Sequence, residues 1–288
     1  MEKLLIIDGN NLLFQMFYGI PTKIYNKERE TIHATIGFIS AIQRIVKENA
    51  ITKIVVVFDK DPAFDKIDSY NDYKANRPND WENLPSDEVP FNEEEKIKRV
   101  LDYLNIKYFD SINMEADDLI SSIVYEYQND HEIIISSFDS DFFQLINSNV
   151  KVLRYRGKNT KIYDYKLFID EFKFEPNKYS FYKALVGDTA DNIKGVQGIG
   201  RVRATNIVNL YNNKEELFLD SFNKLNDNIK KLLVNQEELI KLNEQIIKLE
   251  VKEKFNKSIT EFDFSDEVIS KTNSYILSKC NIFWYYSE

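Results

Sequence analysis

The sequence predicts an α/β fold in which a mostly parallel, twisted sheet carries helices on both faces. Three short apolar runs, at residues 4–7, 54–58 and 133–135, are separated by segments with helical periodicity. Strands buried on both faces are apolar throughout, so runs of this kind are typical of parallel sheets. With 288 residues, 43% of them hydrophobic and 30% charged, the chain is long enough for one large domain or two smaller ones.

The elements follow one another in a regular order. A strand at 4–7 ends at Asp8, and apolar residues at helical spacing then predict a helix over 32–46, with Thr31 as its N-cap. The strand at 54–58 ends at Asp59. A second helix covers 97–104, and the acids at 93–95 suit its positive end. A third helix, at 119–127, leads into the strand at 133–135, which closes shortly before Asp139.

Two regions depart from this alternation. Residues 60–95 form a long polar stretch with four prolines and no clear period, and loops of this length in compact domains are usually functional or disordered. Beyond about residue 175 the pattern becomes mostly helical, with a long helix expected at 226–249. We therefore expect an α/β domain at 1–174 and a helical region at 175–288.

Composition limits the chemistry. The single cysteine, Cys280, excludes an intrachain disulfide framework and a cysteine-rich zinc site, and two histidines, His33 and His131, cannot form a histidine triad. Any metal must therefore be held by oxygen. No window reaches the apolar length of a membrane span, and acids interrupt the N-terminus before any signal-peptide pattern develops.

Acidic residues gather where a ligand would bind. Asp8, Asp59 and Asp139 all lie at or just past the end of a predicted parallel strand, the edge at which open α/β sheets place their ligand crevice. One such Asp alone is most often a turn or cap residue, but here three strands share the feature. Acids also cluster at 115–118, 139–141 and 188–191. The whole set is Asp8, Asp59, Glu115, Asp117, Asp118, Asp139, Asp141, Asp188 and Asp191.

A helix N-terminus favours one or two acids through its dipole, but a dense cluster repels itself unless a cation is present. Mg²⁺ takes oxygen ligands and suits such a site. The formal net charge is −9, with 47 acids and 38 bases. Without the nine clustered acids the remainder is neutral. The net acidity, which argues against nucleic-acid binding by bulk charge, therefore does not exclude a nucleic-acid substrate.

Two further motifs point to phosphate. Half of the eight glycines lie between Gly187 and Gly200, and the turn at 195–200 precedes a predicted helix through 207–210. Alone such a turn is often only a connection, but Lys194, Arg201 and Arg203 around it favour a DNA-backbone contact. In the long loop, Lys74 and Arg77 would share a helical face beside Tyr73. This is either a solvated surface helix or a cationic clamp with an aromatic platform for a base.

Together, the stretches LLIIDGNNL, VVVFD, YNDYKANR, EADD, SSFDSDFFQLI and GDTADNIKGVQGIG resemble the 5′-nuclease (flap endonuclease) family, in the family's order and over residues 3–210. The closest likeness is to stand-alone phage-type enzymes and to the nuclease domain of bacterial repair polymerases. The resemblance implies a PIN-like nuclease core, a helical arch at about 70–95 within the first domain, and a helix–three-turn–helix DNA-binding motif.

The resemblance also assigns roles. It implies that Asp8, Asp59, Glu115, Asp117 and Asp118 hold one Mg²⁺, with Asp117 bridging, and that Asp139, Asp141, Asp188 and Asp191 hold or orient a second. Mn²⁺ is expected to substitute. Catalytic roles fall to Lys74, Arg77, Asp117 and Asp141. DNA contacts fall to Tyr73, Lys74, Arg77, Lys194, Gly195, Gly198, Gly200, Arg201 and Arg203, with K⁺ at the 195–200 carbonyls.

The implied activity is a 5′→3′ exonuclease and flap endonuclease that acts on branched or 5′-ended duplex DNA, or on an RNA–DNA hybrid during primer removal. A replication polymerase or a single-strand-binding protein is an implied partner, and the implied place is the cytoplasm of a bacterium or a phage-infected host. A monomer is the default expectation. One feature departs from the family: residues 78–95 hold seven acids and no Lys or Arg. We hypothesise that repulsion there disfavours long single-stranded flaps.

Two other classes remain as alternatives. One is a catalytically silent module that binds branched DNA, although such a module gains nothing from clustered anions facing a polyanion. The other is a phosphatase with an aspartyl nucleophile, for which Asp139 and Asp141 have the spacing but the supporting lysine pattern is missing.

Overall fold

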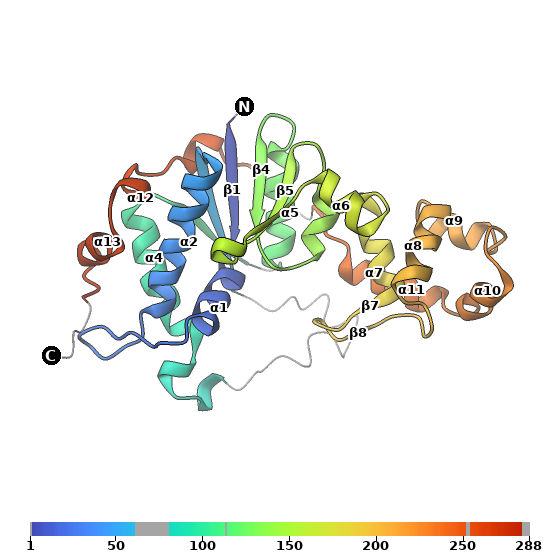
Figure 1. The fold of residues 1–288 in the computed structure, drawn as a ribbon, viewed down its shortest axis with the longest axis horizontal. Coiled ribbons are helices and arrows are strands. Elements are labelled where there is room, and N and C mark those ends of the chain that lie inside the picture. Colours follow the sequence, from blue (N-terminus) through green and yellow to red (C-terminus); the bar gives the residue numbers. More distant parts are fainter. Residues whose placement is uncertain (1, 61–80, 113, 252–253, 284–288) are drawn as a thin grey trace.

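The computed structural model describes residues 2–60, 81–112, 114–251 and 254–283. At its centre is a six-stranded sheet with the order β3-β2-β1-β4-β5-β6 (Figure 1). The first five strands in this order pair in parallel, and β6 is antiparallel to β5. The predicted mostly parallel sheet is confirmed. The strands are β1 (Lys3–Asp8), β2 (Lys53–Asp59), β3 (Lys107–Ser111), β4 (Glu132–Ser136), β5 (Val150–Arg154) and β6 (Lys161–Tyr163).

Helices cover both faces of this sheet. Successive side chains of a strand point to opposite faces, so Leu4 and Ile6 enter one apolar core with α5 and α7, while Leu5 and Ile7 enter another with α1, α2 and α4. This explains why the strands are apolar without alternation. The helices of this part are α1 (Gly9–Gly19), α2 (His33–Asn49), α4 (Glu94–Tyr103), α5 (Ala116–Tyr127), α6 (Tyr165–Phe172) and α7 (Tyr179–Val186).

Short 3₁₀ helices connect these elements. The described part of the long polar stretch, residues 81–93, contains three of them, and residues 61–80 lie outside the described residues. The segment that follows Ser140 is also a 3₁₀ helix. They are η1 (Trp81–Asn83), η2 (Ser86–Glu88), η3 (Pro90–Glu93), η4 (Asp141–Leu145), η5 (Gly157–Asn159), η6 (Pro176–Lys178) and η7 (Ile259–Phe262).

The start of α2 differs from the prediction. Its N-cap position is Ile32, and no side chain of the helix's own N-terminus caps it, so the expected Thr31 cap is wrong. The carboxylate of the distant Glu93 instead accepts hydrogen bonds from the Thr35 N–H (2.7 Å) and hydroxyl (2.8 Å). A buried acid from η3 therefore does what a local cap does elsewhere, which sequence spacing cannot show.

The last part of the chain is helical, as predicted, apart from a two-stranded hairpin. The long helix expected at 226–249 is wrong, because it is divided at 234–236, where Asn235 has a φ of 63° that a continuous helix cannot contain. The elements are β7 (Gly187–Asp188), β8 (Ile193–Lys194), α8 (Arg201–Leu210), α9 (Lys214–Leu219), α10 (Asp227–Leu233), α11 (Glu237–Ile247), α12 (Glu267–Ser270) and α13 (Asn273–Lys279).

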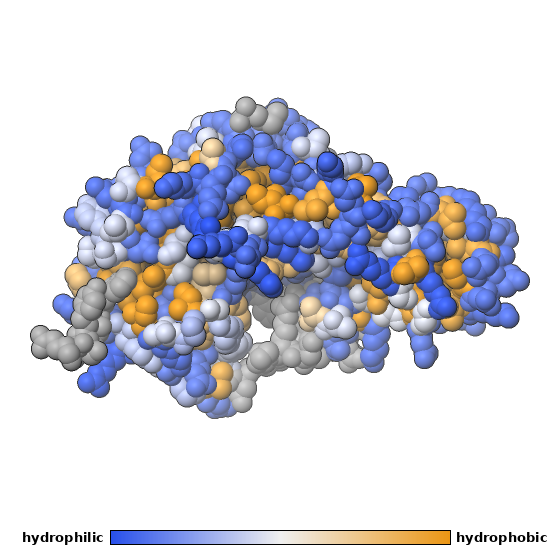
Figure 2. Space-filling view, viewed as in Figure 1, coloured by the Kyte–Doolittle hydropathy of each residue, from blue (hydrophilic) through white to orange (hydrophobic). Residues whose placement is uncertain are grey.

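Helices α8 to α11 extend to one side of the sheet, whereas α12 and α13 return to pack beside α2 and α4 (Figure 1). Val268, Ile276 and Leu277 belong to the same apolar core as these two helices. The face seen in Figure 2 is mainly hydrophilic, with apolar residues in small separate groups. Within the described ranges, no helix is long and apolar enough to cross a membrane.

Candidate metal centre

The strand-end acids are held by hydrogen bonds at one edge of the sheet. Asp8 ends β1 and caps α1, accepting the Asn11 N–H at 3.1 Å and the Ser137 hydroxyl at 2.8 Å. Helix α1 starts directly against β2, since a Cβ at Gly9 would lie 2.6 Å from the Phe58 ring. A glycine after Asp8 is therefore required to bring the carboxylate and the neighbouring strand together.

Asp59 is fixed from two sides. Its backbone N–H donates to Asn10 Oδ1 at 3.0 Å and its carbonyl accepts from Asn10 Nδ2 at 3.2 Å, while its carboxylate accepts the Ser111 hydroxyl at 3.0 Å. Ser111 ends β3 and is paired with Asp59 in the sheet register. The side chains of Asp8, Asp59 and Ser111, at the ends of the adjacent strands β1, β2 and β3, therefore lie at the same edge of the sheet.

The electrostatics show that three of these acids are neighbours. Burial raises the pKa of Asp8 to about 6, although the hydrogen bonds from Asn11 and Ser137 act to lower it. The negative charges of Asp139 and Asp59 contribute to the rise. Asp59 and Asp139, the other strand-end aspartates singled out in the sequence, therefore both lie close enough to Asp8 to affect its ionisation.

Asp139 and Asp141 continue this group. The Asp139 N–H donates to the Ser137 hydroxyl at 3.0 Å, and the Asp141 N–H donates to Asp139 Oδ1 at 2.8 Å. Ser137 contacts both Asp8 and Asp139, so one hydroxyl sets the relative position of the two acids.

Asp141, Asp188 and Asp191 form the most compact group. Each offers one carboxylate oxygen, and these three atoms lie within 4.8 Å of one another. Asp188 and Asp191 occupy a β-hairpin, with Asp188 in β7 and Asp191 in the turn that follows. The hairpin is closed by glycines, because Gly187 has a φ of 82° and a Cβ at Gly195 would lie 2.2 Å from the Val186 carbonyl carbon.

Lys183 of α7 inserts its ammonium group between two of these acids. Its Nζ contacts the carboxylates of Asp141 and Asp188 and lies 3.3 Å from the Ser140 hydroxyl. Burial raises the pKa of Asp141 to about 7, with the Lys183 charge acting against the rise. Burial also pushes the pKa of Asp188 upward, but the charge and hydrogen bond of Lys183 outweigh it and leave that pKa lowered. The two carboxylates raise the pKa of Lys183 itself, so the group stays charged.

The remaining predicted acids begin α5. Glu115 occupies the N-cap position, and Asp117 and Asp118 lie in the first turn; Glu115 and Asp118 are buried and Asp117 is half-buried. Because β3 ends beside Asp59, α5 starts at the same edge of the sheet.

The glycine-rich turn leads into α8 as predicted, with Gly200 as its N-cap and Gly198 at a φ of 84°. Three basic side chains surround it and are exposed: Lys194, Arg201 and Arg203. Arg203 Nη1 donates to the Gly198 carbonyl at 2.5 Å, and Arg201 Nη2 donates to the Glu171 carbonyl at 2.7 Å. Tyr73, Lys74 and Arg77 lie outside the described residues.

The acidic stretch carries less free charge than its sequence suggests. Glu93 is fully buried against α2, Asp87 pairs with Lys23 at 2.8 Å, and Glu94 pairs with Lys98 at 2.8 Å. Glu88 and Glu95 are exposed. The hypothesis of repulsion toward long flaps therefore depends on these two and on the acids at 80 and 82.

The sequence analysis did not assign roles to five residues that hold this site together. Asn10, Asn11, Ser111 and Ser137 position the acids, and Lys183 neutralises two of them. The two consecutive asparagines that follow Asp8 and Gly9 could have been noticed in the sequence. The serines and Lys183 carried no signal, because their contacts exist only after distant segments pack together.

Known proteins resemble this chain in sequence. A family model described as the 5′-3′ exonuclease N-terminal resolvase-like domain matches residues 3–173, and the 5′-3′ exonuclease C-terminal SAM fold matches 174–268. A 5′-3′ exonuclease of Mycoplasmopsis pulmonis is 29% identical over 95% of this chain and 91% of its own length. One from Aquifex aeolicus is 31% identical over 75% of this chain and 72% of its own. DNA polymerase I of Caldicellulosiruptor bescii is 31% identical over 80% of this chain, which spans only 27% of that protein.

Solved structures share the fold. The bacteriophage T5 5′-exonuclease with bound zinc has a TM-score of 0.71 at 22% identity, over 97% of this chain and all of the other. The T5 flap endonuclease in a complex with DNA and metal ions has a TM-score of 0.70 at 21% identity, over the same shares of the two chains. The carboxylate-lined edge, the two matching family models and these relatives lead to one conclusion: the chain belongs to the 5′-3′ exonuclease (flap endonuclease) family of nucleases.

Proposed function

We propose that the chain is a Mg²⁺-dependent, structure-specific 5′ nuclease that cleaves phosphodiester bonds of branched or 5′-ended duplex DNA, both as an exonuclease and as a flap endonuclease. The observation that carries this proposal is the meeting of Asp8, Asp59 and Asp139 with the group of Asp141, Asp188 and Asp191 at one sheet edge. Two divalent ions would turn this edge into a hydrolytic centre.

The donor set fits Mg²⁺. All predicted ligands are carboxylates, the preferred donors of a hard cation. Burial and like charges raise the pKa of Asp8 and Asp141, and a bound cation would favour the ionised form of both. We assign one ion to Asp8, Asp59, Glu115, Asp117 and Asp118, with Asp117 bridging, and the other to Asp139, Asp141, Asp188 and Asp191. When bound, such ions lower the pKa of a coordinated water and stabilise a leaving oxygen. Mn²⁺ would substitute for Mg²⁺.

The chain's own residues complete the mechanism. Lys74 and Arg77 would approach the phosphate and offset its developing charge, and Tyr73 would stack on a base. The 195–200 turn, with Lys194, Arg201 and Arg203, would hold the duplex backbone through its N–H groups and cationic side chains. K⁺ fits the carbonyls of this turn. The Gly198 carbonyl already accepts from Arg203, but a carbonyl has two lone pairs.

We further infer a monomer with an α/β nuclease domain at 1–174 and a helical domain at 175–288. In the cell, this enzyme would remove RNA primers in the cytoplasm, beside a replication polymerase and a single-strand-binding protein. The relatives named DNA polymerase I support this replication context.

The test is cleavage of a 5′-labelled flap duplex with Mg²⁺ by the wild type and by Asp141→Asn and Lys74→Ala. We expect cutting near the junction that both variants lose. Asp130→Asn, an exposed acid in the turn after α5 at the opposite edge of the sheet, is the matched control and should cut normally. Tight junction binding without any cutting by the wild type would instead identify a DNA-structure-binding module.

A further inference from the structure

Helix α11 supports the hairpin that bears two acids of the compact group, although it carries none of the predicted ligands itself. It packs against α7, the helix that leads directly into β7 (Figure 1). Ile246 and Ile247, near the end of α11, form a small apolar cluster with Ile193 of β8. The orientation of Asp188 and Asp191 therefore depends on α11.

A single side chain of α11, Asn243, is hydrogen-bonded to both ends of this hairpin. It is fully buried, and its Nδ2 donates to the Ala184 carbonyl at 3.0 Å and to the Lys194 carbonyl at 2.8 Å. Ala184 lies in the last turn of α7, where carbonyls lack helical partners, and Lys194 pairs with Gly187 in the hairpin. One amide group therefore holds the chain just before and just after the acids.

The end of α11 is joined to the third acid of the group through Gln144. This residue lies three positions after Asp141, in η4. Its Nε2 donates to the Ile247 carbonyl at 3.1 Å, and its Oε1 accepts the Leu249 N–H at 2.9 Å. Helix α11 is therefore hydrogen-bonded to the segment of Asp141 as well as to the hairpin, so it sets how far apart the two lie.

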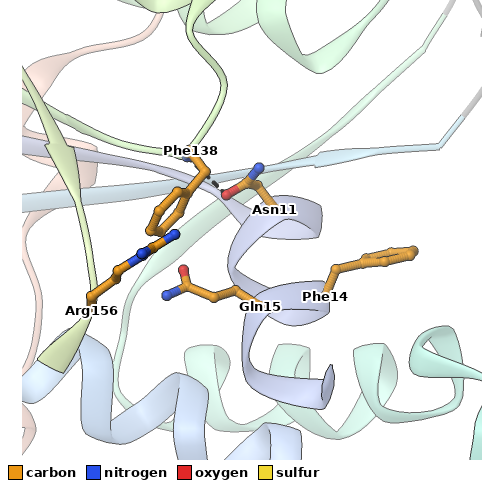
Figure 3. A pocket seen from close by; sticks show the side chains of 5 residues that line it. All are labelled: Asn11, Phe14, Gln15, Phe138 and Arg156. Atoms are coloured by element: carbon orange, nitrogen blue, oxygen red, sulfur yellow. Dashed lines mark hydrogen bonds between the residues drawn. The ribbon is translucent and has the colours of Figure 1, made fainter. Parts of the chain in front are cut away.

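Carboxamides also hold the backbone beside the strand-end acids. Asn10 bonds both the N–H and the carbonyl of Asp59. Asn11 Oδ1 accepts the Phe138 N–H at 3.0 Å, one position before the next strand-end acid (Figure 3). Asn243 is the corresponding group for the hairpin acids, with the difference that it comes from a helix far along the chain.

The carboxamide oxygen of Asn243 is buried and has no hydrogen-bond partner among the described residues. A buried acceptor without a donor is unfavourable, and native proteins contain few of them. The hairpin has only two residues in each strand, and so short a hairpin is at best marginally stable by itself. The polar group of Asn243 is therefore accounted for by the two bonds of its nitrogen, which a hairpin of this length needs.

We propose that Asn243 is a positioning residue of the nuclease. By bonding both ends of the hairpin to α11, it fixes the hairpin acids at the distance from Asp141 that the second of the two divalent ions requires. Because Asn243 is fully buried and bonds only backbone carbonyls, it acts through Asp188 and Asp191 and not by contact with DNA. This inference rests on the proposed function, which assigns the second ion to this group of acids.

The test is a calorimetric titration with Mn²⁺, without DNA, of the wild type and of Asn243→Leu, which keeps the branched shape but has no hydrogen-bond donor. We expect two ions to bind the wild type. The variant should bind the second ion roughly 10- to 100-fold more weakly and the first ion unchanged, because loss of a group that orients metal ligands typically has an effect of this size. In flap cleavage with Mg²⁺, kcat should fall by a similar factor.

Duplex binding in EDTA, measured by fluorescence anisotropy, should change by less than about twofold in Asn243→Leu. The glycine-rich turn keeps a contact of its own, in which the Val196 N–H donates to the Leu185 carbonyl at 2.9 Å. Ile240→Val, a small change at another fully buried residue of α11, is the matched control and should leave ion affinity and kcat unchanged.

Circular dichroism shows whether each variant folds. If Asn243→Leu does not fold, Gln144→Ala tests the same arrangement from η4, and this half-buried side chain is less demanding of the fold. It should also weaken the second ion selectively.

Two outcomes would overturn the inference. In the first, the folded variant binds both ions as tightly as the wild type does. In the second, it binds both ions more weakly by the same factor, which indicates a general loss of structure and not a displaced hairpin. In both cases wild-type cleavage survives, so the proposed function stands. If the wild type binds no divalent ion and cuts no flap, the proposed function fails as well.

Discussion

Removing divalent metal should make the stability of this protein depend steeply on pH. The pKa of Asp8 is raised to about 6 and that of Asp141 to about 7, against an ordinary value of 3.8. In the unfolded chain both groups are ionised above pH 5, whereas the folded protein keeps their protons to higher pH. The folded state therefore binds more protons in this window, and stability falls as pH rises.

The size of the effect follows from these values. One pKa unit corresponds to about 1.4 kcal/mol, so between pH 5 and 8 Asp8 contributes a loss of about 1.4 kcal/mol and Asp141 of about 2.7 kcal/mol. Together they lower the free energy of unfolding by roughly 4 kcal/mol, a large part of the 5–15 kcal/mol typical of a folded domain. The loss begins above pH 3.8, the ordinary pKa, and is complete just above pH 7.

Urea unfolding followed by circular dichroism at pH 5 and pH 8, in EDTA, measures this directly. Asp141→Asn should reduce the pH-dependent difference to about 1.4 kcal/mol, and Asp8→Asn to about 2.7 kcal/mol. Excess Mg²⁺ should raise stability at pH 8 more than at pH 5, because a cation binds the ionised carboxylates. An unchanged difference in the double variant Asp8→Asn/Asp141→Asn would refute the reasoning, because other groups would then carry the effect.

Three further predictions concern single side chains. Lys183→Met removes the ammonium group from between two acids and should raise the affinity for divalent ions at least about tenfold, measured by calorimetry without DNA. Lys183→Arg keeps the positive charge and should not raise this affinity. If Lys183→Met and the wild type bind the ion equally well, the lysine charge does not compete with the metal. Asn10→Ala removes both hydrogen bonds to the backbone of Asp59 at the end of β2. It should lower kcat in steady-state cleavage and reduce the free energy of unfolding in urea by about 1–3 kcal/mol. A normal kcat would show that this contact does not position the site. Glu93→Ala leaves the Thr35 N–H and hydroxyl buried without their acceptor, and should lower the free energy of unfolding in urea by about 3–5 kcal/mol. Glu95→Ala, a change at an exposed neighbouring acid, should lower it by less than about 0.5 kcal/mol. Similar losses in the two variants would contradict the capping role of Glu93.

The fold was largely predictable because its signals are local and repeated. A buried parallel strand must be apolar along its whole length, and all three runs identified in the sequence became strands of the central sheet. The errors arose where a distant segment replaced a local rule. Glu93 caps α2 in place of Thr31, and a left-handed residue at 235 divides the helix expected over 226–249.

The candidate site was predictable for a different reason. The ends of parallel strands meet at one edge, so acids that follow several strands come together whatever the connections between them. The motifs in which these acids occur also carried the family resemblance that the matching family models confirm. The contacts of Ser111 with Asp59, of Ser137 with Asp8 and of Lys183 with Asp141 were not predictable, because the two residues of each pair are 42 or more positions apart in the chain.

The sequence by itself therefore determined the sheet, the edge at which the acids gather and the oxygen chemistry of the site, because each of these depends on residue type and local order. Only the tertiary structure decided which side chains neutralise the acids and which ones lie next to them. It placed Lys183 between Asp141 and Asp188, and it brought the Ser137 hydroxyl to Asp8. Both contacts join separate elements of the fold, and the energy of such contacts depends on distances that exist only once the chain is packed.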